Sequence, residues 1–173
     1  MLESYNSMGA TLRFKNIDIR TELRPGDLGY LLYLHGKLYH EEYGYGLSFE
    51  SYVASSLHEF YEEYNPEKER AWICEHENQM IGFLSLKNRG TVAQLRYFIL
   101  LPAYRGMGLG KYLMQLYTDF MRQCGYRSAY LLTTSELGAA LHLYQQFGFQ
   151  LVEEQASDAF GKPVVMQRYE MTL

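Results

Sequence analysis

Three alternate glycines lie between an apolar run and an amphipathic run, and this short loop restricts the possible folds more than any other feature of the chain. Gly106, Gly108 and Gly110 follow the strand-like residues 92–100 and lead into an amphipathic pattern over 109–124. Glycine has no Cβ atom, so an anion can approach the free amides at a helix start, where the positive end of the helix dipole also lies. We therefore expect a strand, an anion-binding loop and a helix in succession.

Two common phosphate-binding patterns do not describe this loop. A dinucleotide-binding GxGxxG loop would need a glycine at Lys111, and a Walker loop would need Ser or Thr after that lysine, where Tyr112 stands. The pattern [QR]xxGx[GA] does fit, with Arg105, Gly108 and Gly110 in the three fixed places. A glycine turn that only begins a helix is the simpler alternative, so the interpretation depends on what surrounds the loop.

The rest of the chain alternates short apolar runs with helical periodicities. One helical pattern follows Asp27, which we expect to cap it, and ends at Gly44 and Gly46. The expected strands are 17–23, 71–74, 81–86, 92–100, 129–133, 149–154 and 164–171, and the expected helices run from 28 to Gly44 and over 49–61, 109–124 and 136–146. A strand, loop, helix and strand in succession require a crossover with a parallel pair. We expect a mixed sheet of the α/β or α+β class, in the order β-α-α-β-β-β-α-β-α-β-β, within a single domain over 1–173.

Charge and apolar content exclude several classes of protein. The chain has a formal net charge of -4 and no cluster of Lys and Arg, so nucleic acid is not an expected partner. No apolar run reaches the roughly 18 residues that span a bilayer, and charges interrupt the N-terminal stretch 1–16, so neither a membrane span nor a signal peptide is expected. Cys74 and Cys124 lack metal-ligand spacing and are interpreted as free thiols, with no metal site. These points together predict a cytoplasmic protein.

A second motif lies downstream of the glycine loop and points to a known family. Residues 139–149 read AALHLYQQFGF, which resembles the AxxxYxxxGF segment of GNAT acetyltransferases. The loop motif fits the [QR]xxGx[GA] signature of the same family, and the two motifs together cover 94–149. The resemblance implies a V-shaped, split mixed sheet flanked by helices, with acetyl-CoA bound between the strand that ends near Leu100 and the strand that begins near Ala129.

The resemblance also assigns roles to individual residues. The backbone of Phe98, Ile99 and Leu100 would bind the pantetheine arm as an added strand does. Backbone amides of the loop would bind the pyrophosphate, and these belong to Arg105, Gly106, Met107, Gly108, Leu109, Gly110 and Lys111. Tyr144 would be the general acid for the departing thiolate, which is chemically reasonable because a phenol stays protonated at neutral pH. A helix-face core residue is the alternative for Tyr144, and His142 is interpreted as a surface residue.

Two positions depart from the pattern of the family. Leu137 stands where many members have an asparagine that contacts the cofactor, so Thr133, Thr134 or Ser135 would have to supply that contact, with Thr134 our choice. The strand before the loop has Arg96 and Tyr97 where many members have a glutamate base. The identity of the base is therefore open.

The stretch 35–50 narrows the resemblance further. HGKLYHEEYG followed by FE is similar to the HGxLYxxEYGxxxxFE segment in the acetyltransferase half of MarR-GNAT fusion proteins. Those proteins carry a winged-helix DNA-binding half in front. Only about 25 residues precede the first expected helix here, so we expect a freestanding version of the acetyltransferase half.

The same N-terminal region is expected to form the acceptor side. His35, Tyr39 and Glu42 are spaced to share one helix face, with Tyr43 beside them. Eight glutamates and one lysine lie between residues 40 and 69, and acidic groups among aromatic rings suit a cationic amine. Glu41, Glu42 or His35 could be the base, and Glu42 is our choice, although solvated helix surface is the simpler explanation for most of these glutamates.

The predicted function is an acetyl-CoA-dependent transfer of an acetyl group to a primary amine of a small molecule or peptide, in a ternary complex. Protein N-terminal or lysine acetylation is the alternative, followed by a non-catalytic acetyl-CoA-binding module. Edge strands expected after Phe149 leave a homodimer open.

Overall fold

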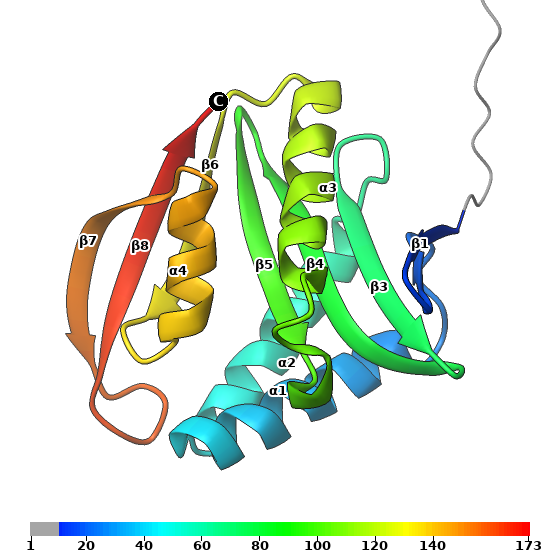
Figure 1. Cartoon of the computed structure of the whole chain (residues 1–173). Helices are drawn as coiled ribbons and strands as arrows, with labels where there is room; N and C mark the ends of the chain where they lie inside the picture. The colour runs from blue at the N-terminus through cyan, green and yellow to red at the C-terminus, as the bar shows by residue number, and fades with distance from the viewer. Residues whose placement is uncertain (1–10) are drawn as a thin grey trace, which may run out of the picture.

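The fold is known from a computed structural model, which describes residues 11–173. One eight-stranded sheet carries helices on both faces (Figure 1). The elements in chain order are β1 (Leu12–Phe14), β2 (Ile17–Arg20), α1 (Asp27–Tyr43), α2 (Leu47–Glu62), β3 (Arg70–His76), β4 (Gln79–Arg89), β5 (Val92–Leu100), the 3-10 turn η1 (Pro102–Tyr104), α3 (Leu109–Cys124), β6 (Ser128–Thr134), α4 (Gly138–Gln146), β7 (Gln150–Ser157) and β8 (Val164–Thr172).

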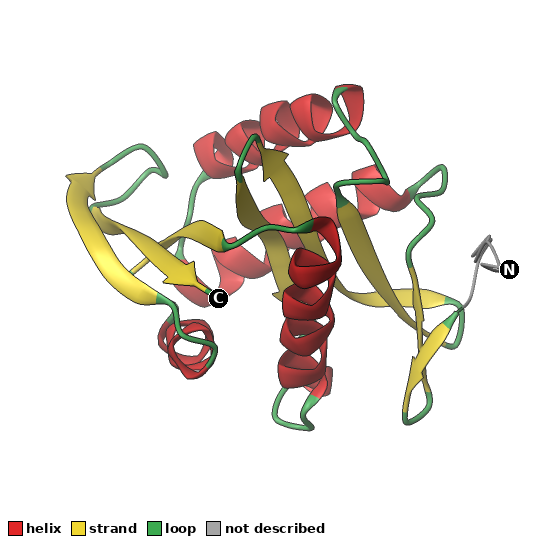
Figure 2. Cartoon of the chain, turned by 90° about the horizontal axis from the view of Figure 1, so that it is seen from above, coloured by secondary structure: helices red, strands yellow, loops and turns green. Residues whose placement is uncertain are grey.

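The sheet is mixed and it splits in the middle. Its strand order is β1-β2-β3-β4-β5-β6-β8-β7, and of its pairs only β5 with β6 is parallel within residues 11–173. That parallel pair is short, with Ala93 opposite Ala129 and Gln94 opposite Tyr130. Beyond it the two strands diverge, so the sheet has two arms, β1–β5 and β6–β8–β7 (Figures 1 and 2). The expectation of a split, mixed sheet flanked by helices is confirmed.

Two apolar cores lie on opposite faces of the sheet. Helix α3 packs Leu113, Tyr117 and Met121 against one face, together with side chains of β4, β6 and β8. Helices α1 and α2 pack Leu31, Val53 and their neighbours against the other face of β3–β5. The periodic apolar positions of each helix are the buried ones, because a half-buried helix presents one stripe to the sheet. The candidate site lies between helices α1 and α2 and the strands β5 and β6, where the two arms of the sheet separate.

Some local predictions fail, and the reasons are physical. Strand β1 was not expected; it pairs with β2 in a hairpin whose tight turn places Lys15 at a positive φ of 54°. Asp27 does not cap α1. Its carboxylate instead accepts hydrogen bonds from the backbone N–H of Arg24 and from the buried guanidinium of Arg20, and Gly26 occupies the N-cap position. A stronger charged partner therefore displaces the capping interaction.

Other expectations about the chain ends and surface have mixed outcomes. The interpretation of the N-terminus as lacking a signal peptide concerns mainly residues 1–10, which lie outside the described residues. Across the part that is described, no helix has both the length and the apolar character of a membrane span.

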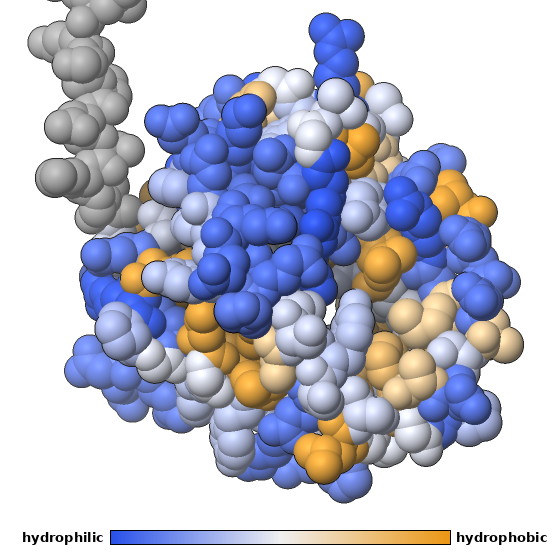
Figure 3. All heavy atoms as spheres, turned by 180° about the vertical axis from the view of Figure 1, so that it is seen from behind, coloured by the Kyte–Doolittle hydropathy of each residue, from blue (hydrophilic) through white to orange (hydrophobic). Residues whose placement is uncertain are grey.

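On the face that carries α1 and α2, apolar side chains lie in separate patches among hydrophilic ones (Figure 3). β7 is an edge strand with Leu151 and Val152 exposed, and the homodimer stays a prediction.

Candidate active site

A bulge in β5 shapes the centre of the site. Ser85 of β4 pairs with Arg96 and Phe83 pairs with Ile99, so Leu84 alone lies opposite the two residues Tyr97 and Phe98. Tyr97 has a φ of 55°, in the left-handed region. A bulge leaves an extra residue out of the ladder and re-aims the side chains around it. Arg96 and Tyr97 are consecutive, yet both side chains reach the same pocket.

The glycine loop after β5 has the geometry of an anion site. Gly106 and Gly108 have φ values of 73° and 94°, which an L side chain rarely adopts. Gly110 has ordinary φ, but an added Cβ would lie 3.2 Å from Leu143 of α4, so this glycine permits close packing. The first amides of α3 lack intrahelical acceptors, and no side chain caps them. Lys15 of the β1–β2 turn supports the loop by donating to the Met107 carbonyl at 3.2 Å.

Arg105 fixes the loop to the rest of the protein. Its Nε donates to the Leu100 carbonyl at 2.9 Å, and its two terminal nitrogens donate to the two oxygens of Glu42 at 3.0 and 2.8 Å. This bidentate pair joins the loop to α1. Glu42, our choice of base, is thus engaged with the loop rather than directed at the aromatic pocket.

A groove leads from the glycine loop into the split of the sheet. Its walls come from α1, the end of β5, the loop and α4, and its lining residues include Tyr39, Glu42, Tyr43, Phe98, Ile99, Leu100, Arg105 and Gly106. The cavity measures about 220 Å³. From Leu95 onward, the edge of β5 that faces the split has no pairing strand within residues 11–173. Its backbone groups are therefore available to an extended ligand.

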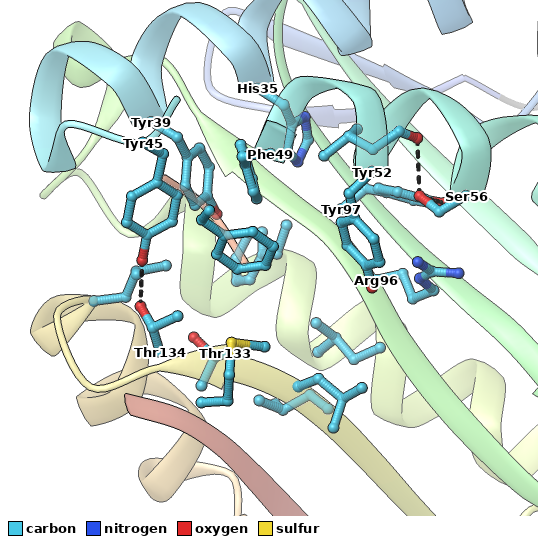
Figure 4. A pocket seen from close by; sticks show the side chains of 18 of the residues that line it. His35, Tyr39, Tyr45, Phe49, Tyr52, Ser56, Arg96, Tyr97, Thr133 and Thr134 are labelled. Carbon is cyan, nitrogen blue, oxygen red and sulfur yellow. Dashed lines mark hydrogen bonds between the residues drawn. The ribbon is translucent and has the colours of Figure 1, made fainter. Parts of the chain in front are cut away.

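A second cavity, the aromatic pocket, adjoins the groove and measures about 130 Å³. The two share Tyr39, Phe98 and Leu137. The lining comes from α1, α2, β5, β6, α4, β8 and the loops α1–α2, β6–α4 and β7–β8 (Figure 4). It consists of His35, Tyr39, Tyr45, Phe49, Tyr52, Val53, Ser56, Gln94, Leu95, Arg96, Tyr97, Phe98, Leu131, Leu132, Thr133, Thr134, Leu137, Tyr144, Phe160 and Met166. None of the eight glutamates between residues 40 and 69 is among them.

His35 lines this pocket as a buried, neutral imidazole that can accept a proton. Its Nδ1 lies 2.9 Å from the Leu31 carbonyl, so Nδ1 carries the proton and Nε2 keeps its lone pair. Burial chiefly, and to a smaller extent the charge of Arg96, lower the pKa of His35 from 6.5 to about 4, although the hydrogen bond to Leu31 opposes this shift. The ring stacks on Tyr39 at 5.6 Å and meets the edge of Tyr97 at 5.9 Å. Figure 4 shows it directed into the space beside Phe49 and Tyr97.

Tyr144 of α4 lines the same pocket. Its side chain is buried between Phe98 and Phe149, with ring centroids 6.2 and 6.0 Å away. Within residues 11–173 its hydroxyl makes no hydrogen bond, although it lines a cavity. Burial, and then the nearby phenol of Tyr39, raise the pKa of Tyr144 well above 10. The phenol is therefore a proton donor over the whole physiological pH range.

The β7–β8 loop and a short hydrogen bond close the far side of the pocket. Gly46 donates its backbone N–H to the Phe160 carbonyl at 2.8 Å, and the Phe160 ring packs on Tyr45 at 5.4 Å. The hydroxyls of Tyr45 and Thr134 lie 2.6 Å apart and join the α1–α2 loop to β6. Burial raises the pKa of Tyr45 to about 12, so this phenol also stays protonated.

The predicted site residues thus divide between two cavities. Phe98, Ile99, Leu100, Arg105, Gly106 and Glu42 line the groove, Met107, Gly108, Leu109, Gly110 and Lys111 form the loop and first turn of α3, and His35, Thr134 and Tyr144 line the aromatic pocket. Tyr39 and Phe98 line both cavities, and Tyr43 lines the groove. Our sequence analysis missed Phe160 and Met166, which follow no recognised motif. Tyr45 and Tyr52 belong to the tyrosine-rich region and could have been suspected from it.

The sequence matches the model of the Acetyltransferase (GNAT) family over residues 36–149. That match includes the bulged strand, the glycine loop and Tyr144. The chain therefore belongs to the acetyltransferase (GNAT) family, a family of acyltransferases.

Individual relatives agree with this assignment. The uncharacterized N-acetyltransferase YjgM of Escherichia coli (strain K12) is 30% identical over 102 residues, which cover 57% of this chain and 61% of YjgM. The match thus spans about three fifths of that relative's length. An acetyltransferase of the GNAT family from Staphylococcus aureus Mu50 superposes with a TM-score of 0.74 at 17% identity, covering 91% of this chain and 99% of the other. A GNAT family acetyltransferase from Elizabethkingia anophelis with acetyl-CoA bound has a TM-score of 0.64 at 15% identity, covering 92% and 100%.

These structural relatives show the fold. The narrower resemblance to the acetyltransferase half of MarR-GNAT fusions stays a prediction, because neither the family model nor these relatives describe such fusions.

Proposed function

We propose that the protein transfers the acetyl group of acetyl-CoA to the primary amine of a small acceptor. The observation that carries this proposal is the junction of the two cavities. A groove that starts at the glycine loop meets a small, partly open aromatic pocket at Tyr39 and Phe98. A long phosphorylated thioester would reach the junction from one side and an amine from the other. The bound acetyl-CoA of the Elizabethkingia relative supports the choice of donor.

The residues of the groove fit this cofactor. Pantetheine carries two amide groups, and the unpaired edge of β5 at Phe98–Leu100 offers backbone partners to an extended chain. The positive φ values at Gly106 and Gly108 and the free amides at the start of α3 suit a pyrophosphate. Acetyl-CoA supplies the activated acetyl group when it is bound.

The chemistry proposed for the junction is a direct attack. The amine nitrogen forms a bond to the thioester carbonyl carbon, and the carbon–sulfur bond breaks. The departing sulfur takes the proton of the Tyr144 hydroxyl, and the amine loses a proton to a base. By position, His35 is the better candidate for that base, because its Nε2 lone pair lies on the acceptor side while Glu42 is paired with Arg105. The fixed orientation of the two bound substrates supplies much of the remaining rate acceleration.

The small size of the aromatic pocket favours a small acceptor over a protein segment. A cavity of about 130 Å³ is close to the size of engineered apolar cavities that hold one benzene, about 150 Å³. The β7–β8 loop covers it through the Gly46–Phe160 bond. A macromolecular acceptor would need an open groove instead.

The test is thiol release from acetyl-CoA in the presence of a panel of small primary amines. We expect release that saturates with at least one amine, and an N-acetylated product by mass spectrometry. Binding of acetyl-CoA without release for any amine or peptide would contradict the proposal and favour a binding module.

A further inference from the structure

The aromatic pocket contains a cation, Arg96, that has no ion-pair partner among the described residues 11–173. Arg20, Arg89, Arg105 and Arg168 all pair with carboxylates. Arg96, by contrast, takes part in no ion pair, and its guanidinium donates no hydrogen bond, within residues 11–173. Its carbon Cζ lies over the Tyr97 ring at 4.8 Å, and the residue is half-buried. Such a group retains all five of its N–H donors for a ligand.

An acidic group close to Arg96 is already engaged. Glu59 pairs with Arg89 at 3.0 Å, and both line, together with Arg96, a more open depression next to the aromatic pocket. The hydrogen bond from Arg89 is the main reason that the pKa of Glu59 is lowered, and the charge of Arg96 contributes less. Glu59 is therefore held by Arg89 and forms no ion pair with Arg96.

The bulge in β5 is what brings this charge into the pocket. In a regular strand, Arg96 and Tyr97 would point to opposite faces of the sheet. Because Tyr97 is the bulged residue, both side chains lie on the face covered by α1 and α2. Figure 4 shows Arg96 beside Tyr97 on one side of the pocket, and Tyr45 and Thr134 on the other.

The rest of the pocket offers no carboxylate to a cationic ligand. Its lining consists of aromatic and aliphatic side chains, hydroxyls, one amide, neutral His35 and Arg96. A diamine or polyamine would therefore meet a positive charge in a partly desolvated space, which is unfavourable. A carboxylate would form a charge-assisted, bidentate pair with the guanidinium.

We propose that the acceptor is a small amine that also carries a carboxylate, that is, a free amino acid, with its carboxylate bound to Arg96 and its amine directed toward the junction with the groove. This inference rests on the proposed acetyl transfer and names the substrate class of the same site. The aromatic walls of the pocket suit an apolar side chain. The expectation of an acidic wall for a cationic amine is not supported by the pocket lining.

The experiment compares matched amines that differ only in the carboxylate. Suitable pairs are phenylalanine with phenethylamine, tyrosine with tyramine, and leucine with isoamylamine. In at least one pair we expect kcat/KM for the amino acid to exceed that of the plain amine by roughly 10- to 100-fold, as for a lost hydrogen bond to a charged group. Equal or higher kcat/KM for the plain amine in every pair overturns the proposal, while the acetyl transfer itself stands.

Variants of one residue connect the preference to Arg96. Arg96→Gln should raise KM for the amino acid about 10- to 100-fold and reduce the ratio of kcat/KM between amino acid and plain amine by a similar factor. Arg96→Lys keeps the positive charge but loses the planar guanidinium that can bind a carboxylate through two N–H groups. It should retain part of the preference for the amino acid. Arg70→Gln is the matched control, because Arg70 also lies over a ring, Phe120 at 4.3 Å, but lines neither cavity. An unchanged preference in Arg96→Gln overturns the proposal.

A binding measurement separates this proposal from the proposed function. With the protein saturated with CoA, the favoured amino acid should raise the melting temperature further, and Arg96→Gln should abolish that second increase. The absence of both this increase and thiol release, for every acceptor, overturns the amino acid proposal and the acetyl transfer together. The increase without any release supports the amino acid site and contradicts only the acetyl transfer.

Discussion

The groove and the aromatic pocket share lining residues, but the groove is shaped mainly by backbone and the pocket mainly by side chains. The groove depends on backbone geometry, with an unpaired strand edge, two glycines of positive φ and the first turn of a helix. The pocket depends on side chains from helices, strands and loops between α1 and β8, many of which pack ring against ring, with one unpaired cation. A backbone site can bind the same ligand with many different side chains, whereas a side-chain site changes its ligand with one substitution. The groove therefore suits a donor common to a family, and the pocket suits the particular acceptor.

Breaking the backbone site should have the largest effect. Gly108→Glu places a side chain at a φ of 94° and a negative charge in the anion loop. We expect affinity for acetyl-CoA to fall at least 100-fold and the stabilisation of the melting temperature by CoA to disappear. Isothermal titration measures the affinity directly.

A matched glycine controls for backbone strain. Gly90 has a φ of 79° in the β4–β5 turn, with nothing within 4 Å of an added Cβ. Gly90→Glu should lower the melting temperature but keep the CoA-induced increase. Retention of that increase in Gly108→Glu would show that the loop does not bind the cofactor.

The hydroxyl of Tyr144 should separate catalysis from binding at the junction. Tyr144→Phe removes only the oxygen, so we expect kcat to fall roughly 10- to 1,000-fold while the Kd of acetyl-CoA hardly changes. Steady-state kinetics with titration of the cofactor checks both. Tyr61→Phe, on the exposed face of α2, is the control and should leave kcat unchanged. If Tyr144→Phe loses stability but keeps its kcat, the hydroxyl has only a structural role.

The two candidate bases belong to different cavities, which allows a direct comparison. His35→Gln should lower kcat/KM for the amine about 10- to 100-fold, with little effect on the KM of acetyl-CoA. Glu42→Gln breaks the pair with Arg105 and should raise the KM of acetyl-CoA instead, by a few-fold. Glu41→Gln, at the exposed neighbouring position, is the control. A larger loss of kcat in Glu42→Gln than in His35→Gln would return the role of base to Glu42.

The buried His35 should also make stability depend on pH. Its pKa is about 4 in the folded protein and about 6.5 in the unfolded chain. The unfolded state therefore binds the extra proton first as the pH falls, and the folded state loses stability between pH 6.5 and 4. We expect this residue to cost about 2 kcal/mol of unfolding free energy between pH 7.5 and 5.

Urea unfolding at several pH values measures this dependence. His35→Gln should remove that part of the slope, and His58→Gln, at an exposed position of α2, should not. An unchanged slope in His35→Gln would mean that the ring titrates normally.

The same difference in construction explains what the sequence could predict. The backbone part of the groove is contiguous in sequence, because β5, the glycine loop and the start of α3 follow one another, and glycine spacing reports backbone conformation directly; only the side chains of α1 and α4 come from elsewhere. The split between β5 and β6 was implied by the family resemblance. These parts of the fold can be predicted from the sequence.

The pocket could not be assembled in the same way. Arg96 was noted only as a departure from the family pattern, because a bulge that turns its side chain toward Tyr97 has no recognisable sequence signal here. Phe160 reaches the site from the β7–β8 loop, which has no periodicity. The eight glutamates were expected near the acceptor, but Glu42 pairs with Arg105 and Glu59 with Arg89. Pairing across distant segments decides such outcomes, and sequence spacing does not report it.

The unpaired edge of β5 has a consequence for the behaviour of the protein in solution. Free strand edges usually invite pairing with other chains and hence aggregation. This edge lies inside the split, between the two arms of the sheet and beside α1 and α4, whose side chains line the adjoining groove (Figure 1). A strand of another protein brings side chains on both of its faces and would collide with these walls. A thin chain with amide groups, such as the proposed pantetheine arm, is narrow enough to enter, so a recess that would admit pantetheine also disfavours pairing of this edge with a strand of another protein.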